Sequence, residues 1–197
     1  MLQAGSGSNK RKRADDREAA LLAGVRRADR AAFADLYRCY HPRLYGYLRR
    51  LLRDPGLVEE VLDDVMLVVW KDARKFRSES RVSTWIFGIA YRKALSAMRS
   101  ARRYHAPLDY GADLDAIAGS SAEIDEWIVA ALARLSPDHQ QVMVLTYLSG
   151  FSVQEIAQIA GCPANTVKTR MFHARRRLKV LLPTLAGWTE VKKHERQ

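Results

Sequence analysis

The chain has 197 residues and a formal net charge of +11, so it can form one large domain or two small ones and should attract polyanions. Apolar residues make up 48% of it, as in an ordinary globular protein, but no run of about 18 apolar residues exists, which excludes a transmembrane helix. Cys39 and Cys162 lie far apart and outside any Cys/His cluster, so we expect buried reduced thiols and no zinc site. The sequence contains no phosphate-binding loop, nucleophile elbow or HExxH motif, so we expect no enzyme activity, cofactor or metal.

The first part of the chain predicts helices behind an irregular tail. Residues 1–14 contain Gly, Ser and a basic stretch with no apolar region after it, which predicts a disordered tail rather than a secretory signal. A short helix is expected from Asp15 or Asp16, and a longer helical stretch after Asp29. Pro42 should interrupt or kink this stretch, because proline has no backbone N–H.

The next helix has an unusually large apolar surface. Asp54-Pro55 predicts its start, since Asp caps helices and Pro suits their first position, and the pattern continues to about Arg74. One face is purely aliphatic and should be core: Val58, Val61, Leu62, Val65 and Val69. Residues 65–70 are apolar almost all round, behind acidic first turns, so this helix is buried on more than one side, within the domain or against a partner.

Residues 75–82 form a polar loop with one aromatic residue, Phe76. Ser83 should cap a helix that starts apolar and becomes basic further along. Such a loop and helix could bind single-stranded nucleic acid, because bases stack on aromatic rings while the backbone follows positive charge. An equally good alternative is a solvated surface helix with Phe76 as a plug in the core.

The second half of the chain begins with a change of composition. Residues 104–119 hold Pro, Gly and Asp without a sustained period, which predicts an interdomain linker. Ser120 and Glu123 form a capping box for a helix to Leu135, and Ser136-Pro137 caps another that ends near Gly150. The protein is therefore expected to be all-α, with two small helical domains at residues 15–103 and 120–182 and a tail at 183–197.

Residues 152–182 predict a helix-turn-helix. Ser152 and Glu155 form a capping box, Gly161 can end the first helix in the left-handed conformation, and Pro163 suits the start of the second. The second helix has one apolar stripe, made of Val167, Met171, Ala174, Leu178 and Leu181.

The opposite face of this helix mixes amide, hydroxyl, aromatic and cationic groups, which are the types that read base edges. It carries Asn165, Thr169, Phe172 and Arg176, flanked by Lys168, His173 and Arg175. A basic face is often only a solvated surface. Here the short turn, the exposed Phe and the net charge of +11 favour a helix that lies in a DNA major groove.

Taken together, roughly residues 28–182 resemble a sigma-70-family factor of the extracytoplasmic-function (ECF) group. The first domain is similar to sigma region 2 and the second to sigma region 4. The residues that carry the resemblance are FADLYRCYHPRLYGYLRRLL, VEEVLDDVMLVVW and KFRSESRVSTWIFGIAYRKAL in the first domain, and LARLSPDHQQVMVLTYLSGFSVQEIAQIAGCPANTVKTRMFHARRRL in the second.

The resemblance implies three sets of site residues. Contact with the β′ clamp helices of core RNA polymerase falls on Glu59, Asp63, Asp64, Met66, Leu67 and Trp70. Capture of the melted −10 strand falls on Phe76, Arg77, Ser78, Glu79, Ser80, Arg81, Ser83 and Arg92, although the family often has Asn where Arg92 stands. Recognition of the −35 element falls on Asn165, Lys168, Thr169, Arg170, Phe172, His173, Arg175 and Arg176, with Arg170, Arg175 and Arg176 mostly holding phosphate.

The resemblance also implies partners: core RNA polymerase through its β′ clamp helices and β flap, promoter DNA, and an anti-sigma factor. It implies a cytoplasmic protein of transcription initiation that does not insert into a membrane. Two other interpretations stay open. One is a stand-alone helix-turn-helix regulator, which would need a symmetric dimer and DNA site. The other is a sigma-like decoy for an anti-sigma factor, for which degraded DNA-facing residues or a fused receiver domain would be expected.

Overall fold

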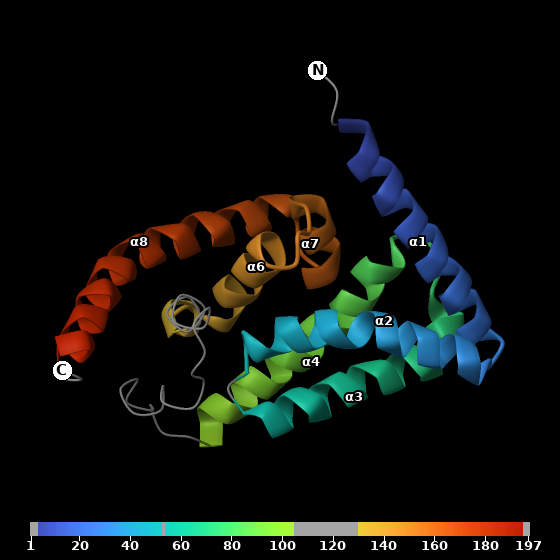
Figure 1. The fold of residues 1–197 in the computed structure, drawn as a ribbon, viewed down its shortest axis with the longest axis horizontal. Coiled ribbons are helices and arrows are strands. Elements are labelled where there is room, and N and C mark those ends of the chain that lie inside the picture. Colours follow the sequence, from blue (N-terminus) through green and yellow to red (C-terminus); the bar gives the residue numbers. More distant parts are fainter. Residues whose placement is uncertain (1–3, 53, 105–129, 195–197) are drawn as a thin grey trace. The chain divides into compact units, whose positions relative to one another are not determined.

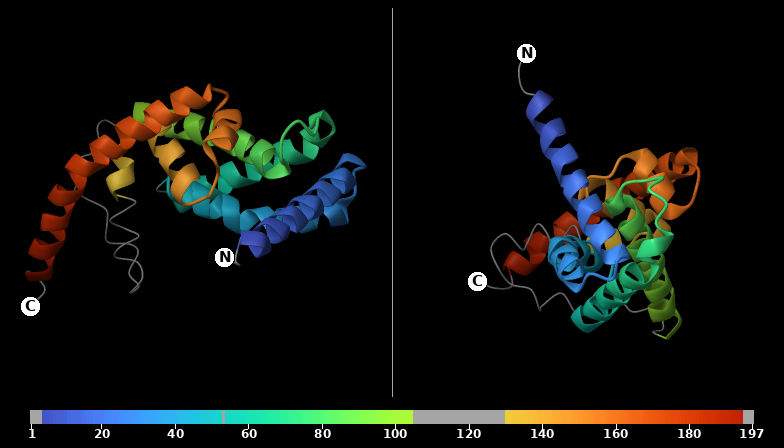
Figure 2. Two further views of the ribbon diagram at one scale, coloured as in Figure 1. Left: turned by 90° about the horizontal axis from the view of Figure 1, so that it is seen from above. Right: turned by 90° about the vertical axis from the view of Figure 1, so that its right-hand side faces the viewer.

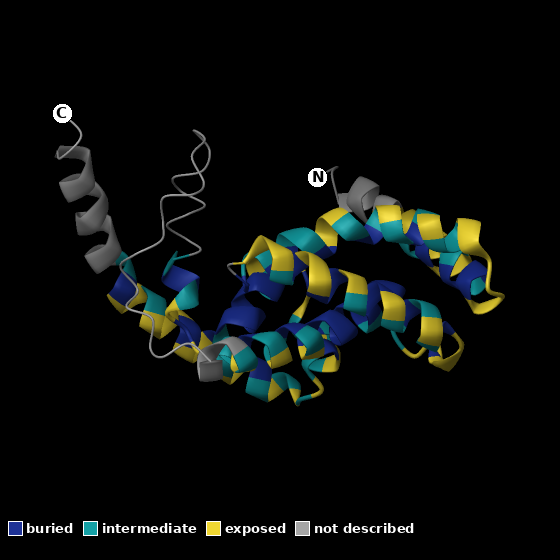
Figure 3. Ribbon diagram, turned by 90° about the horizontal axis from the view of Figure 1, so that it is seen from below, coloured by how far each residue is buried: buried dark blue, intermediate teal, exposed yellow. Residues whose placement is uncertain are grey.

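The computed structural model describes residues 4–52, 54–104 and 130–194. In these ranges the chain is mostly helical (Figure 1). It divides into two compact units, the first holding residues up to Ala94 together with Gln158–Gly161, and the second holding the remainder. Within the first unit, α2 packs against both α1 and α3, and within the second α6 packs against α8 (Figures 1 and 2). Buried and exposed positions alternate along the helices, as expected for amphipathic helices around a core (Figure 3).

The first helix is longer than the sequence predicts. Helix α1 spans Ala4–Arg26, so the expected disordered tail over residues 1–14 is wrong from Ala4 onward. The C-terminal half of α1 buries Leu22 and Val25 against the unit. Once these contacts form the helix, extending it upstream adds one hydrogen bond for each residue ordered, whereas starting a helix is costly.

Helix α2 spans Arg30–Arg49 and begins as expected after Asp29, whose carboxylate accepts hydrogen bonds from the N–H groups of Ala31 (2.9 Å) and Ala32 (3.2 Å). Pro42 was predicted to interrupt or kink this stretch, and the interruption is wrong, because the helix continues through Pro42 to Arg49. Buried residues on both sides of the proline, including Leu36, Tyr40, Leu44 and Leu48, hold the helix in place. Tertiary packing outweighs the lost backbone hydrogen bond here.

Helix α3 spans Pro55–Asp72 and is followed by a 3-10 turn, η1, at Ala73–Lys75. Asp54 caps it as predicted by accepting a hydrogen bond of 2.9 Å from Gly56 N–H. The five aliphatic residues predicted as its core face are all buried, which confirms the helical phase.

Helix α4 spans Val82–Tyr104, so the loop ends one residue earlier than predicted. Ser83 lies inside the first turn rather than at the cap, and its side chain is buried. The apolar part of the helix, including Ile86, Phe87 and Ala90, completes the core of the first unit.

The predicted linker at 104–119 and the capping box of Ser120 and Glu123 lie outside the described residues, apart from Tyr104, which ends α4. Residues 130–133 are helical and precede α6, which spans Pro137–Tyr147. The helix starts where predicted, but Ser136 makes no capping hydrogen bond through its side chain, so that part of the prediction is wrong. The proline that follows Ser136 is enough to favour the start.

The helix-turn-helix consists of α7 at Val153–Ala160 and α8 at Ala164–His194. The capping box is present: Ser152 N–H donates to Glu155 Oε2 (2.8 Å), and Glu155 N–H donates to Ser152 Oγ (3.3 Å). Gly161 ends α7 with φ of +62°, and Cys162 N–H donates back to the carbonyl of Ala157 (3.1 Å). Helix α8 runs past Leu182, where the domain was predicted to end.

Two expectations from composition are settled by the fold. Cys39 and Cys162 are free, but each is half-buried rather than buried as predicted. Within the described ranges, no helix combines the length and the apolar character needed to cross a membrane.

Candidate nucleic-acid interface

The outer face of α8 is exposed as the sequence predicts. Val167, Met171 and Ala174 are buried, and Phe172 between them in sequence is 62% exposed. A large aromatic ring is rarely left in water without a partner, since burying it stabilises a protein by about 2 kcal/mol. Six predicted DNA-contacting residues share this exposed surface: Asn165, Lys168, Thr169, His173, Arg175 and Arg176.

Neighbouring side chains already orient part of this face. The Thr169 hydroxyl donates to the carbonyl of Asn165 (2.9 Å), so it meets a ligand as an acceptor. The ring of Phe172 lies edge-on to that of His173, with centroids 5.4 Å apart. Arg175 lies over the ring of Tyr147 on α6, with its guanidinium carbon 5.9 Å from the ring centroid. These contacts restrict rotamers and so lower the entropy lost on binding.

Arg170 differs from the other predicted contacts on α8. It pairs with Asp138 on α6 at 3.3 Å, and its side chain is only 25% exposed. The structure therefore places Arg170 in the packing of α6 against α8 rather than on the open face.

His139 and Tyr147 on α6 were not singled out from the sequence. The ring of His139 lies 6.3 Å from that of His173. Burial, together with the nearby His173 and Arg170, lowers the pKa of His139, so the neutral form is favoured in the folded protein. No local pattern could have revealed either residue, because both meet α8 only through tertiary packing.

The loop before α4 is divided between the core and the surface. Phe76 is only 9% exposed and packs on Trp85 with ring centroids 5.3 Å apart, so the structure favours the core-plug interpretation of this residue. Ser83 is also buried, so neither side chain is open to a DNA strand in this conformation. The exposed part of the loop is Arg77, Ser78 and Glu79, and Ser78 adopts the left-handed conformation with φ of +60°.

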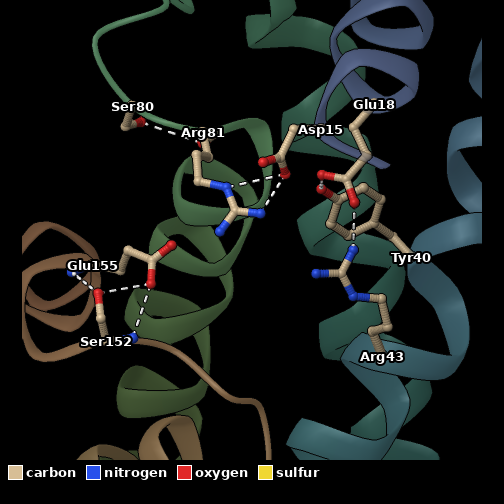
Figure 4. Close-up of polar contacts among 8 residues, drawn as sticks. All are labelled: Asp15, Glu18, Tyr40, Arg43, Ser80, Arg81, Ser152 and Glu155. Atoms are coloured by element: carbon tan, nitrogen blue, oxygen red, sulfur yellow. Dashed lines mark hydrogen bonds and ion pairs between the residues drawn. The ribbon is translucent and has the colours of Figure 1, made fainter. Parts of the chain in front are cut away.

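The other predicted −10 residues lie on either side of this exposed turn. Ser80 is half-buried, and its hydroxyl donates to the carbonyl of Arg81 (3.3 Å). Arg81 is bound to Asp15 on α1 through an ion pair and a hydrogen bond from its Nε of 3.0 Å (Figure 4). Arg92 on α4 is exposed.

The residues of α3 that are predicted to contact polymerase also differ in how far they are buried. Met66 is only 2% exposed and belongs to the core, because it lies on the inner side of a helix that is apolar almost all round. Leu67 is 47% exposed, and Glu59 and Asp63 are exposed as well. Trp70 is half-buried. Asp64, also half-buried, pairs with Lys93 on α4 at 2.7 Å.

Helix α2 supplies residues to this acidic surface that sequence reasoning did not assign. Tyr37 donates a hydrogen bond to Asp63 (3.2 Å), His41 lies 3.6 Å from Glu59, and Phe33 packs edge-on against Trp70 at 5.0 Å. Tyr45 continues the same row, with its ring stacked on that of His41 at 5.9 Å. The spacing of four residues along α2 was a usable signal, because such residues share one helix face.

Comparison with known proteins finds a family match in each half of the chain. Residues 36–104 match the family described as Sigma-70 region 2, and residues 125–178 match Sigma-70, region 4. The chain is 32% identical over 168 residues to the ECF RNA polymerase sigma factor SigM of Mycobacterium tuberculosis, covering 84% of each chain. It is 30% identical over 169 residues to SigK of Mycobacterium bovis, covering 81% of this chain and 90% of that one.

Two solved structures are similar in fold. One is CnrH in complex with the cytosolic domain of CnrY, with a TM-score of 0.67 and 24% identity over 86% of this chain and 98% of that chain. The other is the sigma factor RpoE of Bartonella quintana in complex with the anti-sigma factor NepR, with a TM-score of 0.59 and 27% identity over 77% of this chain and 96% of that chain.

The all-helical fold, the helix-turn-helix and the two matched regions are those of a transcription factor of the sigma type. With both family regions matched and relatives of 30% and 32% identity over most of its length, the chain belongs to the ECF group of the sigma-70 family. Its function is to direct RNA polymerase to specific promoters at transcription initiation, and this family is not one of catalytic enzymes.

Proposed function

We propose that three surfaces of this sigma factor divide the work of promoter recognition. The outer face of α8 reads the −35 element in duplex DNA. The exposed loop turn Arg77–Glu79, together with Arg92, holds the opened −10 strand. The surface that α2 and α3 form around Tyr37, Asp63 and Leu67, called the α2–α3 surface below, binds core RNA polymerase. The observation that carries the proposal is that α8 has one buried face and one exposed face. Val167 and Ala174 on the first are fully buried, whereas Phe172 on the second is 62% exposed. An exposed aromatic ring among cationic and hydroxyl groups suits contact with bases.

The α2–α3 surface supports the polymerase assignment by its chemistry. It combines an exposed Leu67, the rings of Tyr37 and Trp70, and the carboxylates of Glu59 and Asp63. This mixture of apolar and acidic groups on a chain of net charge +11 suits a protein partner with basic residues rather than DNA.

An anti-sigma factor is the proposed regulator of this chain. The sigma factor of Bartonella quintana to which it is similar was solved with its anti-sigma factor NepR. An inhibitor that covers the α2–α3 surface or the α8 face would block polymerase or DNA directly. Co-purification from cells, with and without Leu67→Glu, would show whether a bound inhibitor uses the α2–α3 surface.

The test is transcription in vitro from a promoter library by core polymerase, with and without the chain. We expect run-off products enriched in one −35 sequence and one −10 sequence only when the chain is present. A library that gives no enrichment, under conditions in which the chain binds the core enzyme, would contradict the proposal. A symmetric footprint from the chain alone would instead favour the stand-alone regulator.

A further inference from the structure

The N-terminal half of α1 carries a charge pattern that the functions above do not use. Four consecutive cationic residues, Lys10 to Arg13, precede Asp15. The described side chains Arg11, Lys12 and Arg13 are exposed. This part of the chain lies before residue 36, where the match to Sigma-70 region 2 begins.

Helix α1 is held firmly to the first unit, so these cations have a defined place. Glu18 accepts hydrogen bonds from Tyr40 (2.5 Å) and Arg43 (2.7 Å) on α2 (Figure 4). At the other end of the helix, Arg74 Nε donates to the carbonyl of Arg26 (3.2 Å). Helix α1 is therefore a fixed element of the unit.

The contact between Asp15 and Arg81 places the cationic residues before Asp15 beside the loop that holds the exposed turn Arg77–Glu79. Figure 4 shows the Arg81 side chain reaching from the start of α4 to Asp15 on α1. Arg11 and Lys12 lie four and three residues before Asp15, so they share its helix face. Four residues span only about 6 Å along a helix, which brings both cations close to the loop.

We propose that α1 is an additional nucleic-acid-binding element, in which Arg11 and Lys12 hold phosphates of the opened promoter strand next to the loop turn Arg77–Glu79. The inference rests on the proposed role of that loop. Phosphate is the expected ligand because every nucleotide carries a negatively charged phosphate that arginine and lysine can pair with, whatever the base sequence. A single strand is favoured over duplex DNA because the adjoining loop is the element proposed to hold the opened strand, and the strand's backbone can follow the positive surface from the loop to α1.

The test compares the full chain with an R11Q/K12Q variant in binding a fluorescent single-stranded DNA of mixed sequence at several salt concentrations. Two lost phosphate contacts should lower the affinity several-fold and make the slope of log K against log salt shallower by about 1.4. The matched control is R17Q/R27Q, which removes the same charge from exposed positions, Arg17 lying away from the Asp15 face and Arg27 beyond the end of α1. The control should keep the original slope.

The outcomes separate this inference from the proposed function. An unchanged slope in R11Q/K12Q, or an equal change in R17Q/R27Q, would overturn the role of α1. If R77Q weakens binding while R11Q/K12Q does not, the inference is wrong and the loop keeps its role. If only R11Q/K12Q weakens binding, α1 is a strand-binding element and the loop assignment is wrong.

Discussion

Glu18 on α1 accepts a hydrogen bond of 2.5 Å from the hydroxyl of Tyr40 on α2, although 22 residues separate them in sequence. Tyr40 is fully buried, and burial together with Glu18 raises its pKa, so the hydroxyl remains a donor. The same carboxylate pairs with Arg43 at 2.7 Å, and the guanidinium of Arg43 lies 4.7 Å from the Tyr40 ring. This network attaches α1 to the domain.

Replacing Glu18 by Ala should lower the free energy of unfolding of the full chain by about 3 kcal/mol, because it leaves a buried hydroxyl and a partly buried cation unpaired. Urea unfolding followed by circular dichroism measures this. Asp16→Ala, which removes a carboxylate from an exposed position on the same helix, should change the stability by less than about 0.5 kcal/mol. Equal effects of the two substitutions would show that the network contributes nothing specific.

Asp15→Asn should loosen the loop before α4. The ion pair with Arg81 is only about a third exposed, so its loss should cost no more than about 1 kcal/mol of stability. Amide exchange in residues 77–81 should become faster, and affinity for single-stranded DNA should rise because a carboxylate beside the strand path is gone. Asp16→Asn removes the same charge from an exposed position and is the control. Slower exchange in the loop, or the same exchange in both variants, would contradict the role given to Asp15.

Substitutions at the neighbouring residues Met66 and Leu67 should change different properties of the protein. Leu67→Glu should reduce binding to core RNA polymerase at least tenfold while leaving stability nearly unchanged, because Leu67 is 47% exposed. Met66→Ala should instead lower the free energy of unfolding by about 3 kcal/mol, because it opens a cavity in the core. Titration of labelled core enzyme and urea unfolding separate the two effects. Normal polymerase binding by Leu67→Glu would rule out this surface.

Lys168 and Arg175 should differ in what they contribute to −35 binding. Lys168→Ala should relax the preference at one base position, a loss of about 1 to 3 kcal/mol of discrimination. Arg175→Ala should weaken all sequences alike and reduce the salt slope by about 1, as expected for a phosphate contact. Binding to a set of −35 variants distinguishes the two patterns. The control is Lys179→Ala, which removes an exposed cation of α8 beyond the predicted contact residues, the last of which is Arg176. A uniform loss in Lys168→Ala would show that Lys168 reads no base.

The lowered pKa of His139 predicts that the stability of the second unit depends on pH. Its pKa is lowered on folding by burial and by the neighbouring His173 and Arg170, so the unfolded chain binds a proton more readily. Its contribution to stability is therefore present above the unfolded pKa of 6.5 and is lost as the pH falls toward the lower pKa of the folded state. His139→Asn should flatten the change in unfolding free energy between about pH 7 and about pH 5. An unaltered pH profile in this variant would contradict the assignment.

Helix phase and helix starts could be predicted from the sequence because they depend on local spacing. The stripe of Val167, Met171 and Ala174 is buried as its period indicates, and the capping box of Ser152 and Glu155 forms as its residue types indicate. Predictions failed where a tertiary contact outweighed a local preference. Pro42 remains within α2 because the residues around it are buried. The first helix begins at Ala4 rather than at Asp15 or Asp16 for another reason, since a helix that has already formed extends upstream at little cost.

The amino-acid sequence alone was sufficient for the all-α class, the family and the exposed face of α8, since period, caps and motif spacing are all local properties of the chain. It could not say which loop residues are buried, such as Phe76 and Ser83, or that Arg81 meets Asp15 from 66 positions away. Those outcomes depend on how helices distant in sequence pack together. Packing is a competition among many alternative contacts, and a spacing pattern describes only one helix at a time.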